Sequence, residues 1–265
     1  YEPDLESAVY TTLRDKLGDK LRYRHVTEVT SLLELEARMR KASEDDPKIW
    51  LNVENGLLNL DTGSIIQHTP DVFTPGRIHA KWTDKPKPEA EAKYLQMMEG
   101  IMGENVPIFD EQCGLALSTD VPSFQSMVLL FGHSNAGKSQ VLWLLGSFFG
   151  EENLSAVDFP LLADEKFYRG ALLSKRVNIV HDTNVDYLIN YVVELNRIIS
   201  GEPVDVNEKY RKIQGKVRLY TKHFAASNNP LAARSSQEGF DKRLVIIPCN
   251  RVFRRDDPDR VEGIY

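Results

Sequence analysis

Residues 128–139 have the types and spacing that bind phosphate. An apolar run at 128–131 precedes a loop, 132–139, that fits the pattern G-x-x-x-x-G-K-[ST]. The following stretch, 140–149, has the apolar spacing of a helix. A strand, a glycine loop and a helix in this order are the context that a phosphate-binding loop requires. The pattern therefore predicts a nucleoside triphosphate site, and a chance glycine turn is the less favoured interpretation.

Each part of this loop has an expected role. Gly132 and Gly137 let the backbone turn so that N–H groups point into one concavity, which attracts phosphate together with the helix N-terminus. Lys138 would place its charge on the β- and γ-phosphates, and the Ser139 hydroxyl would coordinate Mg²⁺. The sequence thus predicts ATP and Mg²⁺ as ligands. The expected ATP contacts come from Gly132, His133, Ser134, Asn135, Ala136, Gly137, Lys138, Ser139 and Gln140.

A phosphate loop needs an acid on the metal side, and Asp182 is the candidate. It follows the apolar stretch 177–180, which reads as a buried strand. A carboxylate at the end of a neighbouring strand can orient Mg²⁺ and the attacking water. Asp182 is therefore predicted as a catalytic and metal-binding residue, with an ordinary solvated carboxylate as the alternative. His181 is interpreted as an ordinary residue at a strand end.

Two further residues could complete an ATPase. Asn228 ends an apolar strand, where its amide could sense the γ-phosphate, although an Asn-Asn-Pro turn explains it equally well. Arg243 comes just before the apolar run 244–247 and could act as an arginine finger on the ATP of a neighbouring subunit. Lys242 and Arg234 are rivals for that role. The predicted catalytic residues are Lys138, Asp182, Asn228 and Arg243.

A basic turn between two short strands is the candidate for binding DNA. Cations and one aromatic ring would suit a grip on a phosphate backbone that does not depend on base sequence. Charged turns are more often simply solvated, but the position between two strands of the predicted ATPase favours function. The predicted DNA-binding residues are Lys209, Tyr210, Arg211 and Lys212.

The elements that must position these residues alternate between strand and helix from about residue 124. This alternation predicts an α/β fold with a mostly parallel central sheet. It includes a helix from about 185 to 200. Upstream, the pattern predicts helices at 3–21 and from 30 or 31 to 41, a small β-meander at 49–66, and helices at 89–102 and 108–119. The expected division is a helical segment at 1–48, a small α+β domain at 49–120, and an ATPase domain at 121–265.

Composition and charge fit a soluble protein that does not cross a membrane. The 265 residues carry a net charge of −6, and no apolar run approaches the roughly 20 residues of a membrane span. Cys113 and Cys249 are far apart, and the six histidines have no metal-type spacing. The N-terminus does not look like a signal peptide. We expect an intracellular protein of the host cytoplasm or replication site, not secreted, cut from a longer chain.

The order of these motifs resembles the superfamily 3 helicases, above all the helicase half of phage, plasmid and poxvirus primase–helicases. The resemblance covers about residues 50–253. Beside the phosphate loop it rests on Gly201-Glu202-Pro203-Val204, Lys209-Tyr210, Asn228-Asn229-Pro230 and the upstream block 52–63.

This resemblance implies a AAA+ fold, a homo-hexameric ring that hydrolyses ATP between subunits, and 3′-to-5′ movement along single-stranded DNA in replication. It places Asp182 in the Walker B position, Asn228 in the sensor position, Arg243 in the finger position and 209–212 in the pore. It also implies a primase or polymerase domain in the same longer polypeptide. Family members usually have Glu, or two acids, where this chain has His181-Asp182, which leaves open whether Asp182 both supports Mg²⁺ and activates water.

Other functions remain open. A AAA+ protein remodeller or loader shares the ATP site but does not need a basic pore hairpin. An ATP-binding scaffold without strong hydrolysis would tolerate His181-Asp182. A small-molecule kinase is a weaker alternative, because nothing in the sequence resembles a lid over an acceptor.

Overall fold

The computed structural model describes residues 5–41, 50–69, 71–72, 74, 76–118, 125–183, 188, 191–207, 216–229 and 238–254. The chain divides into two compact units. One is Tyr1–Pro47 with Thr69–Phe73, and the other is Lys48–His68 with Thr74–Tyr265. The division into three parts expected from the sequence stays a prediction. Among the described helices, none has the length and apolar character needed to span a bilayer.

The first unit is a pair of helices. Helix α1 (Leu5–Leu17) leads through a 3-10 turn, η1 (Gly18–Lys20), into α2 (Tyr23–Lys41). The prediction of α2 was wrong in its start, which lies at Tyr23 and not at residue 30 or 31. Local hydrogen bonds supply the reason: the Arg22 N–H donates to Nδ1 of His25, and the Thr27 hydroxyl donates to the carbonyl of Tyr23.

The second unit begins with the predicted β-meander. Strands β1 (Trp50–Val53), β2 (Gly56–Asn59) and β3 (Ile65–Ile66) form an antiparallel sheet in that order. Two helices then follow, α3 (Pro88–Met102) and, after the turn η2 (Gly103–Asn105), α4 (Val106–Leu117). These elements confirm the strands and helices predicted for this stretch within a few residues.

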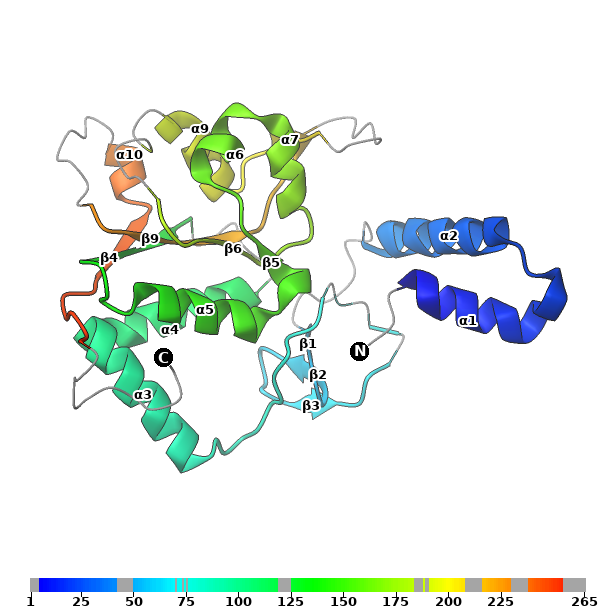
Figure 1. The fold of residues 1–265 in the computed structure, drawn as a ribbon, viewed down its shortest axis with the longest axis horizontal. Coiled ribbons are helices and arrows are strands. Elements are labelled where there is room, and N and C mark those ends of the chain that lie inside the picture. Colours follow the sequence, from blue (N-terminus) through cyan, green and yellow to red (C-terminus); the bar gives the residue numbers. More distant parts are fainter. Residues whose placement is uncertain are drawn as a thin grey trace. The chain divides into compact units, whose positions relative to one another are not determined.

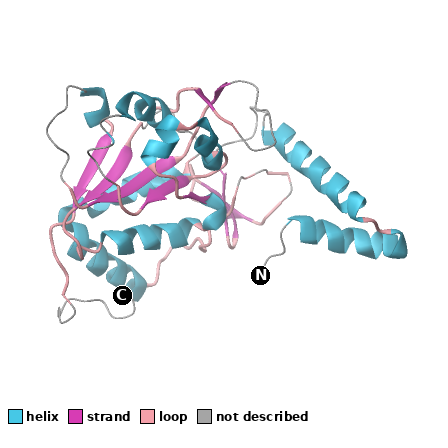
Figure 2. Ribbon diagram, turned by 45° about the horizontal axis from the view of Figure 1, so that its top comes forward, coloured by secondary structure: helices cyan, strands magenta, loops and turns pink. Residues whose placement is uncertain are grey.

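A five-stranded parallel sheet forms the centre of this unit (Figure 2). Its order is β10-β4-β9-β6-β5. The bounds are β4 (Met127–Phe131), β5 (Leu154–Ser155), β6 (Val177–Val180), β9 (Lys222–Ser227) and β10 (Leu244–Pro248). A separate antiparallel ribbon joins β7 (Val204–Asp205) to β8 (Lys216–Val217). The mixed α/β fold with a parallel sheet is as predicted from the sequence.

Helices cover both faces of the parallel sheet. Figure 1 shows α3, α4 and α5 on one face and α6, α7 and α9 on the other. The core alternates accordingly along β4: Val128 and Leu130 pack toward α3–α5, while Met127 and Leu129 pack toward α6 and α9. Burial on both faces explains why β4 reads as a continuous apolar run. The remaining bounds are α5 (Lys138–Phe149), η3 (Glu151–Asn153), α6 (Phe159–Asp164), α7 (Lys166–Arg169), η4 (Gly170–Leu172), α9 (Val192–Ile199) and α10 (Glu238–Asp241).

Some elements differ from the sequence prediction. Helix α10 is one turn long and was not predicted, since a single turn has too few residues for an apolar period. A helix was expected over 185–200; the described part of it is α9 with Leu188, and 184–187 and 189–190 lie outside the described residues. Both differences concern short or incompletely described segments beside the sheet.

His223 in β9 is an uncompensated polar group in the core. It is 2% exposed, and among the described residues neither ring nitrogen has a hydrogen-bond partner. The ring lies edge-on to Phe159 at a centroid distance of 5.8 Å. Burial, and to a smaller extent the charge of Lys222, lowers the pKa of His223 from 6.5 to about 3. The folded protein therefore holds this imidazole in its neutral form.

We expect His223→Leu to raise stability at neutral pH by roughly 1–3 kcal/mol, because an unpaired buried polar group is replaced by an apolar one. In the wild type the unfolded chain binds a proton at His223 below pH 6.5, whereas the folded chain does so only near pH 3. Stability should thus fall as the pH drops through this window, and less so in the variant. Urea unfolding between pH 7 and pH 4 measures both effects. Equal acid sensitivity of the two proteins would contradict the prediction.

Candidate functional site

The phosphate-loop residues lie at the carboxyl edge of the parallel sheet. The chain leaves β4 for β5 at one end of the sheet, while β10 pairs with β4 on the other side. When the connections from two neighbouring parallel strands run in opposite directions along the sheet, a crevice forms at the carboxyl ends of those strands. Ligands bind in such crevices in open α/β sheets. A cavity of about 950 Å³ occupies this position. Its lining comes from 134–140 after β4, 181–182 after β6, 226–228 at the end of β9, and 252–254 after β10.

Close contacts with backbone and side-chain atoms explain the glycines of the loop. A Cβ on Gly132 would lie 1.9 Å from the carbonyl oxygen of Cys249, whose N–H donates to the carbonyl of Phe131 at 2.6 Å. Gly137 has φ +83°, and a Cβ there would also meet the side chain of Ile101. Asn135 adopts φ 62°, which few residues other than glycine tolerate. Cys249, which follows β10, and Ile101 of α3 thus pack closely against the loop and restrict its conformation.

We expect Gly132→Ala to abolish the nucleotide binding predicted for this loop, because the added methyl group meets backbone and forces the loop away from β10. Overpacking of this kind costs roughly 1–3 kcal/mol of folding stability. Titration with ATP and thermal unfolding measure the two effects.

Gly114→Ala in α4 is the matched control for this substitution. Nothing lies within 4 Å of a Cβ at Gly114, and its backbone φ is not positive. Alanine is about 1 kcal/mol better than glycine in a helix interior, so this variant should bind ATP normally and be slightly more stable. Normal ATP binding by Gly132→Ala would contradict the prediction.

Lys138 connects the loop to the neighbouring strand. Its amine donates to the carbonyls of Gly132 and His133, each at 2.7 Å, and to Oδ1 of Asn228 at 2.9 Å. The residue is 7% exposed. Burial lowers the pKa of Lys138, while Cys249 and Asp182 act in the opposite direction. A cation is thereby held between the phosphate loop and the end of β9.

The predicted acid and amide lie at the same edge. His181 and Asp182 follow β6, Asn228 follows β9, and all three are exposed to the cavity. The Thr183 N–H donates to the carbonyl of Ala226, which ties the end of the acid-bearing segment to β9. The structure thus brings together Lys138, Asp182 and Asn228.

The donor groups present fit a magnesium ion held jointly with phosphate. The described residues contain no cluster of three or more His, Cys, Asp and Glu side chains. Mg²⁺ does not require one, since it usually binds one or two carboxylates together with substrate phosphates and water. Ser139 and Asp182 both line the cavity beside the loop and are exposed, so a hydroxyl and a carboxylate are available.

Arg243 lies at the opposite edge of the sheet. It directly precedes β10, whose first residue pairs with Met127 at the start of β4. Its guanidinium donates to Oγ of Ser200 at 2.9 Å, to the carbonyl of Gly239 at 2.6 Å and to Oε1 of Gln125 at 3.0 Å. Arg243 therefore stands apart from the cavity of its own chain, and its expected role as a finger stays a prediction that requires a second subunit. Arg234, its rival, lies outside the described residues; Lys242 is exposed beside it.

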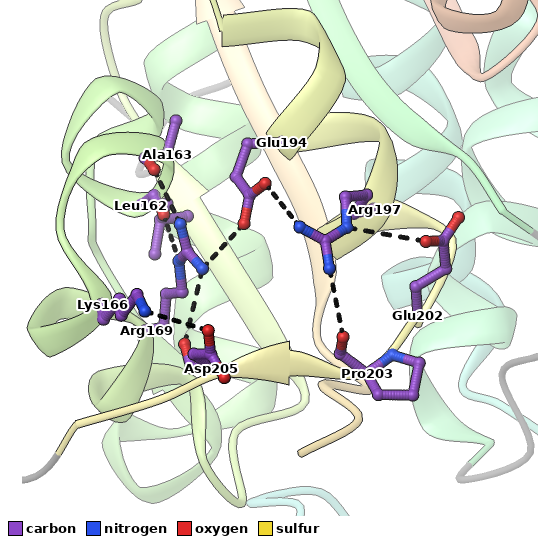
Figure 3. Close-up of polar contacts among 9 residues, drawn as sticks. All are labelled: Leu162, Ala163, Lys166, Arg169, Glu194, Arg197, Glu202, Pro203 and Asp205. Carbon is purple, nitrogen blue, oxygen red and sulfur yellow. Dashed lines mark hydrogen bonds and ion pairs between the residues drawn. The ribbon is translucent and has the colours of Figure 1, made fainter. Parts of the chain in front are cut away.

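The basic residues Lys209, Tyr210, Arg211 and Lys212 lie outside the described residues, but the base of the ribbon that carries them is described. Arg169 of α7 is 4% exposed and lies beside β7 (Figure 3). It donates to the carbonyls of Leu162 and Ala163, each at 2.7 Å, and pairs with Glu194 of α9 at 2.8 Å. A longer bond of 3.4 Å joins it to the carbonyl of Asp205 in β7.

A hydrogen bond from α9 and an ion pair from α7 also hold the base of the ribbon. Arg197 of α9 donates to Oε2 of Glu194 at 3.0 Å and to the carbonyl of Pro203 at 3.5 Å (Figure 3). Lys166 donates to Oδ2 of Asp205 at 2.9 Å, a contact exposed to solvent, and it lowers the pKa of that carboxyl. The base of the ribbon is thus fixed to two helices that cover the sheet.

Sequence reasoning missed one wall of the cavity, formed by Val252, Phe253 and Arg254. These residues follow β10 and reach the loop because β10 pairs with β4, although more than a hundred residues separate the two strands. In the sequence, Val252 and Arg254 are only an apolar residue and a cation just after the final strand. Their local spacing does not indicate that they lie near the phosphate loop.

Two family descriptions match parts of the chain. Residues 3–103 match "D5 N terminal like", and residues 130–243 match "Family of unknown function (DUF5906)". The first match spans the block 52–63, and the second spans the phosphate loop, Asp182, Asn228 and Arg243. No curated protein sequence matches the chain.

Among solved structures, apo forms of the NrS-1 C-terminal region are similar to this chain. The A form has 18% sequence identity and a TM-score of 0.48, over 68% of this chain and 44% of that chain. The structure of region 305–718 has the same identity and TM-score, over 68% of this chain and 45% of that chain. The chain therefore spans less than half the length of these solved chains. Its family matches fall in two parts, one D5 N-terminal-like and one of a family without known function.

Proposed function

We propose that this chain is an ATP-dependent DNA helicase or translocase module that serves the replication of a virus, phage or mobile element. The observation that carries the proposal is the cavity at the carboxyl edge of the sheet. It gathers a phosphate loop, a buried lysine, a carboxylate and an amide from three adjacent parallel strands. This arrangement is what hydrolysis of a bound triphosphate requires.

In the proposed AAA+ site each residue has a separate task. The loop N–H groups bind the phosphates, and Lys138 exchanges its contacts with Gly132, His133 and Asn228 for phosphate oxygens. Ser139 and Asp182 would hold Mg²⁺, which supplies charge neutralisation on the phosphates. Asp182 also orients water for attack, and Asn228 reports the presence of the γ-phosphate to β9. Hydrolysis then breaks the bond to the terminal phosphoryl group.

The proposed assembly is a homo-hexameric ring on single-stranded DNA. Arg243 is at the sheet edge away from its own cavity, a position that suits action on the ATP of a neighbouring subunit. The ribbon β7–β8 would place Lys209, Tyr210, Arg211 and Lys212 on DNA. The D5 N-terminal-like match over residues 3–103 supports a place in a primase–helicase. A primase or polymerase domain of the same longer polypeptide is the proposed covalent partner.

Phosphate release with and without single-stranded DNA tests the proposal. We expect DNA to stimulate ATP hydrolysis by the wild type, and we expect Lys209→Ala to abolish the stimulation while basal hydrolysis continues. Exposed Lys81→Ala is the matched control and should respond to DNA like the wild type. Stimulation by protein partners, with no response to DNA, would instead favour a AAA+ remodeller or loader. Binding of ATP without phosphate release would favour a scaffold.

A further inference from the structure

The β10 side of the cavity carries side chains whose interactions are incomplete. Val252 is an apolar residue that is 44% exposed, although it lines a cavity. Arg254 is also exposed there, and within the part of the chain that the structure describes its guanidinium has no partner. An open apolar surface beside an unpaired cation is the composition expected of a ligand site.

Phe253 holds this wall against the phosphate loop. Its N–H donates at 2.9 Å to the carbonyl of Asn135, a loop residue with positive φ. Its ring packs on the core, close to Gly100 of α3, and the Arg251 guanidinium lies 5.0 Å from the ring centroid. Because Phe253 is anchored in this way, Val252 and Arg254 on either side of it are presented to the cavity at a fixed distance from the loop.

The strand order gives the cavity two different ends. Asp182 and Asn228 follow β6 and β9, which lie on one side of β4, whereas 252–254 follow β10 on the other side. The metal and the γ-phosphate require the carboxylate, the lysine and the amide. A triphosphate that lies along the loop with its terminal phosphate at Asp182 and Asn228 therefore directs its nucleoside toward Val252 and Arg254.

We propose that Val252 and Arg254 form the nucleoside subsite of this cavity, an inference that rests on the proposed ATP site. Val252 packs against the face of the base, and the planar Arg254 guanidinium stacks on the same ring system. Both contacts are made to the face of the base, which purines share, and not to its hydrogen-bonding edge. The subsite thus binds ATP and GTP with similar affinity.

Calorimetric titration with ATP, GTP and inorganic tripolyphosphate, in the presence of Mg²⁺, tests this assignment. Arg254→Ala and Val252→Ser should each weaken ATP and GTP binding by about fivefold to tenfold, the size of one lost stacking or apolar contact. Tripolyphosphate binding should stay within twofold of the wild type, because the loop is untouched. Both positions are exposed, so the variants should fold normally. Ile246→Ser is the matched control: it is 46% exposed on β10 itself but does not line the cavity.

The outcomes separate the subsite from the site as a whole. Unchanged ATP affinity in both variants would overturn the subsite, and so would an equal loss of ATP and tripolyphosphate, which would place Arg254 on a phosphate. A strong preference of the wild type for ATP over GTP would overturn contact through the face of the base alone. A wild type that binds neither ATP nor tripolyphosphate would overturn the proposed function, whatever the variants do.

Discussion

Lys138→Met is expected to lower the rate of ATP hydrolysis by roughly 10²–10³-fold, the usual effect of removing one donor that stabilises the charge of a transition state. Lys138 is the described cation whose amine reaches both the loop carbonyls and Asn228. Methionine fills similar space without charge, so it removes this donor and leaves the rest of the loop in place. Steady-state phosphate release measures the loss.

The folded state should tolerate this substitution. Burial lowers the pKa of Lys138, which means that the charged amine is already disfavoured where it lies. Methionine removes that penalty but also three hydrogen bonds, and the two effects oppose each other in the free energy of unfolding. A loss of activity with little change in melting temperature is therefore the expected pattern. Exposed Lys81→Met is the control, and hydrolysis by Lys138→Met at the wild-type rate would exclude the proposed role.

The strand, loop and helix at 127–149 could be predicted from sequence because the residues that determine them are local. Four specified positions lie within eight residues, between an apolar strand and an apolar helix, and the structure places β4 and α5 there. Asp182 and Asn228 could be predicted to share its edge because parallel strands present their carboxyl ends together. The pattern of apolar and polar residues thus predicted the order of strands and helices along the chain.

The order of the strands within the sheet could not be predicted from the sequence. For this reason the cavity wall that follows β10 was missed. The pairing of β10 with β4 brings Val252 to the phosphate loop. This pairing joins strands far apart in the chain, which no local spacing encodes. The buried Arg169 was missed for a related reason, since an arginine reads as a surface residue until its carbonyl partners from α6 are in place.

Arg169→Met should be the most destabilising change near the predicted DNA-binding ribbon. The guanidinium is buried and satisfied by two carbonyls and Glu194. Removing one partner of a buried pair typically costs 3–5 kcal/mol. Glu194 is 24% exposed and keeps Arg197 as a second partner, so we expect about 3 kcal/mol, the lower end of that range. Urea unfolding at neutral pH measures it.

Loss of this contact should also uncouple the ribbon from the proposed ATP site. Arg169 bonds β7 at Asp205 and α9 at Glu194. Helix α9 is followed by Ser200, which accepts a hydrogen bond from Arg243, the residue proposed to act on the ATP of a neighbouring subunit. If the ribbon moves with α9, Arg169→Met should abolish stimulation by DNA while basal hydrolysis remains. Lys166→Met is the control, because it removes the exposed ion pair to the same Asp205. It should change neither the free energy of unfolding nor the stimulation by DNA, because solvent already screens that pair. Full stimulation by DNA in a destabilised Arg169→Met protein would contradict this prediction. It would show that Arg169 contributes only to folding stability and that other contacts couple the ribbon to ATP hydrolysis.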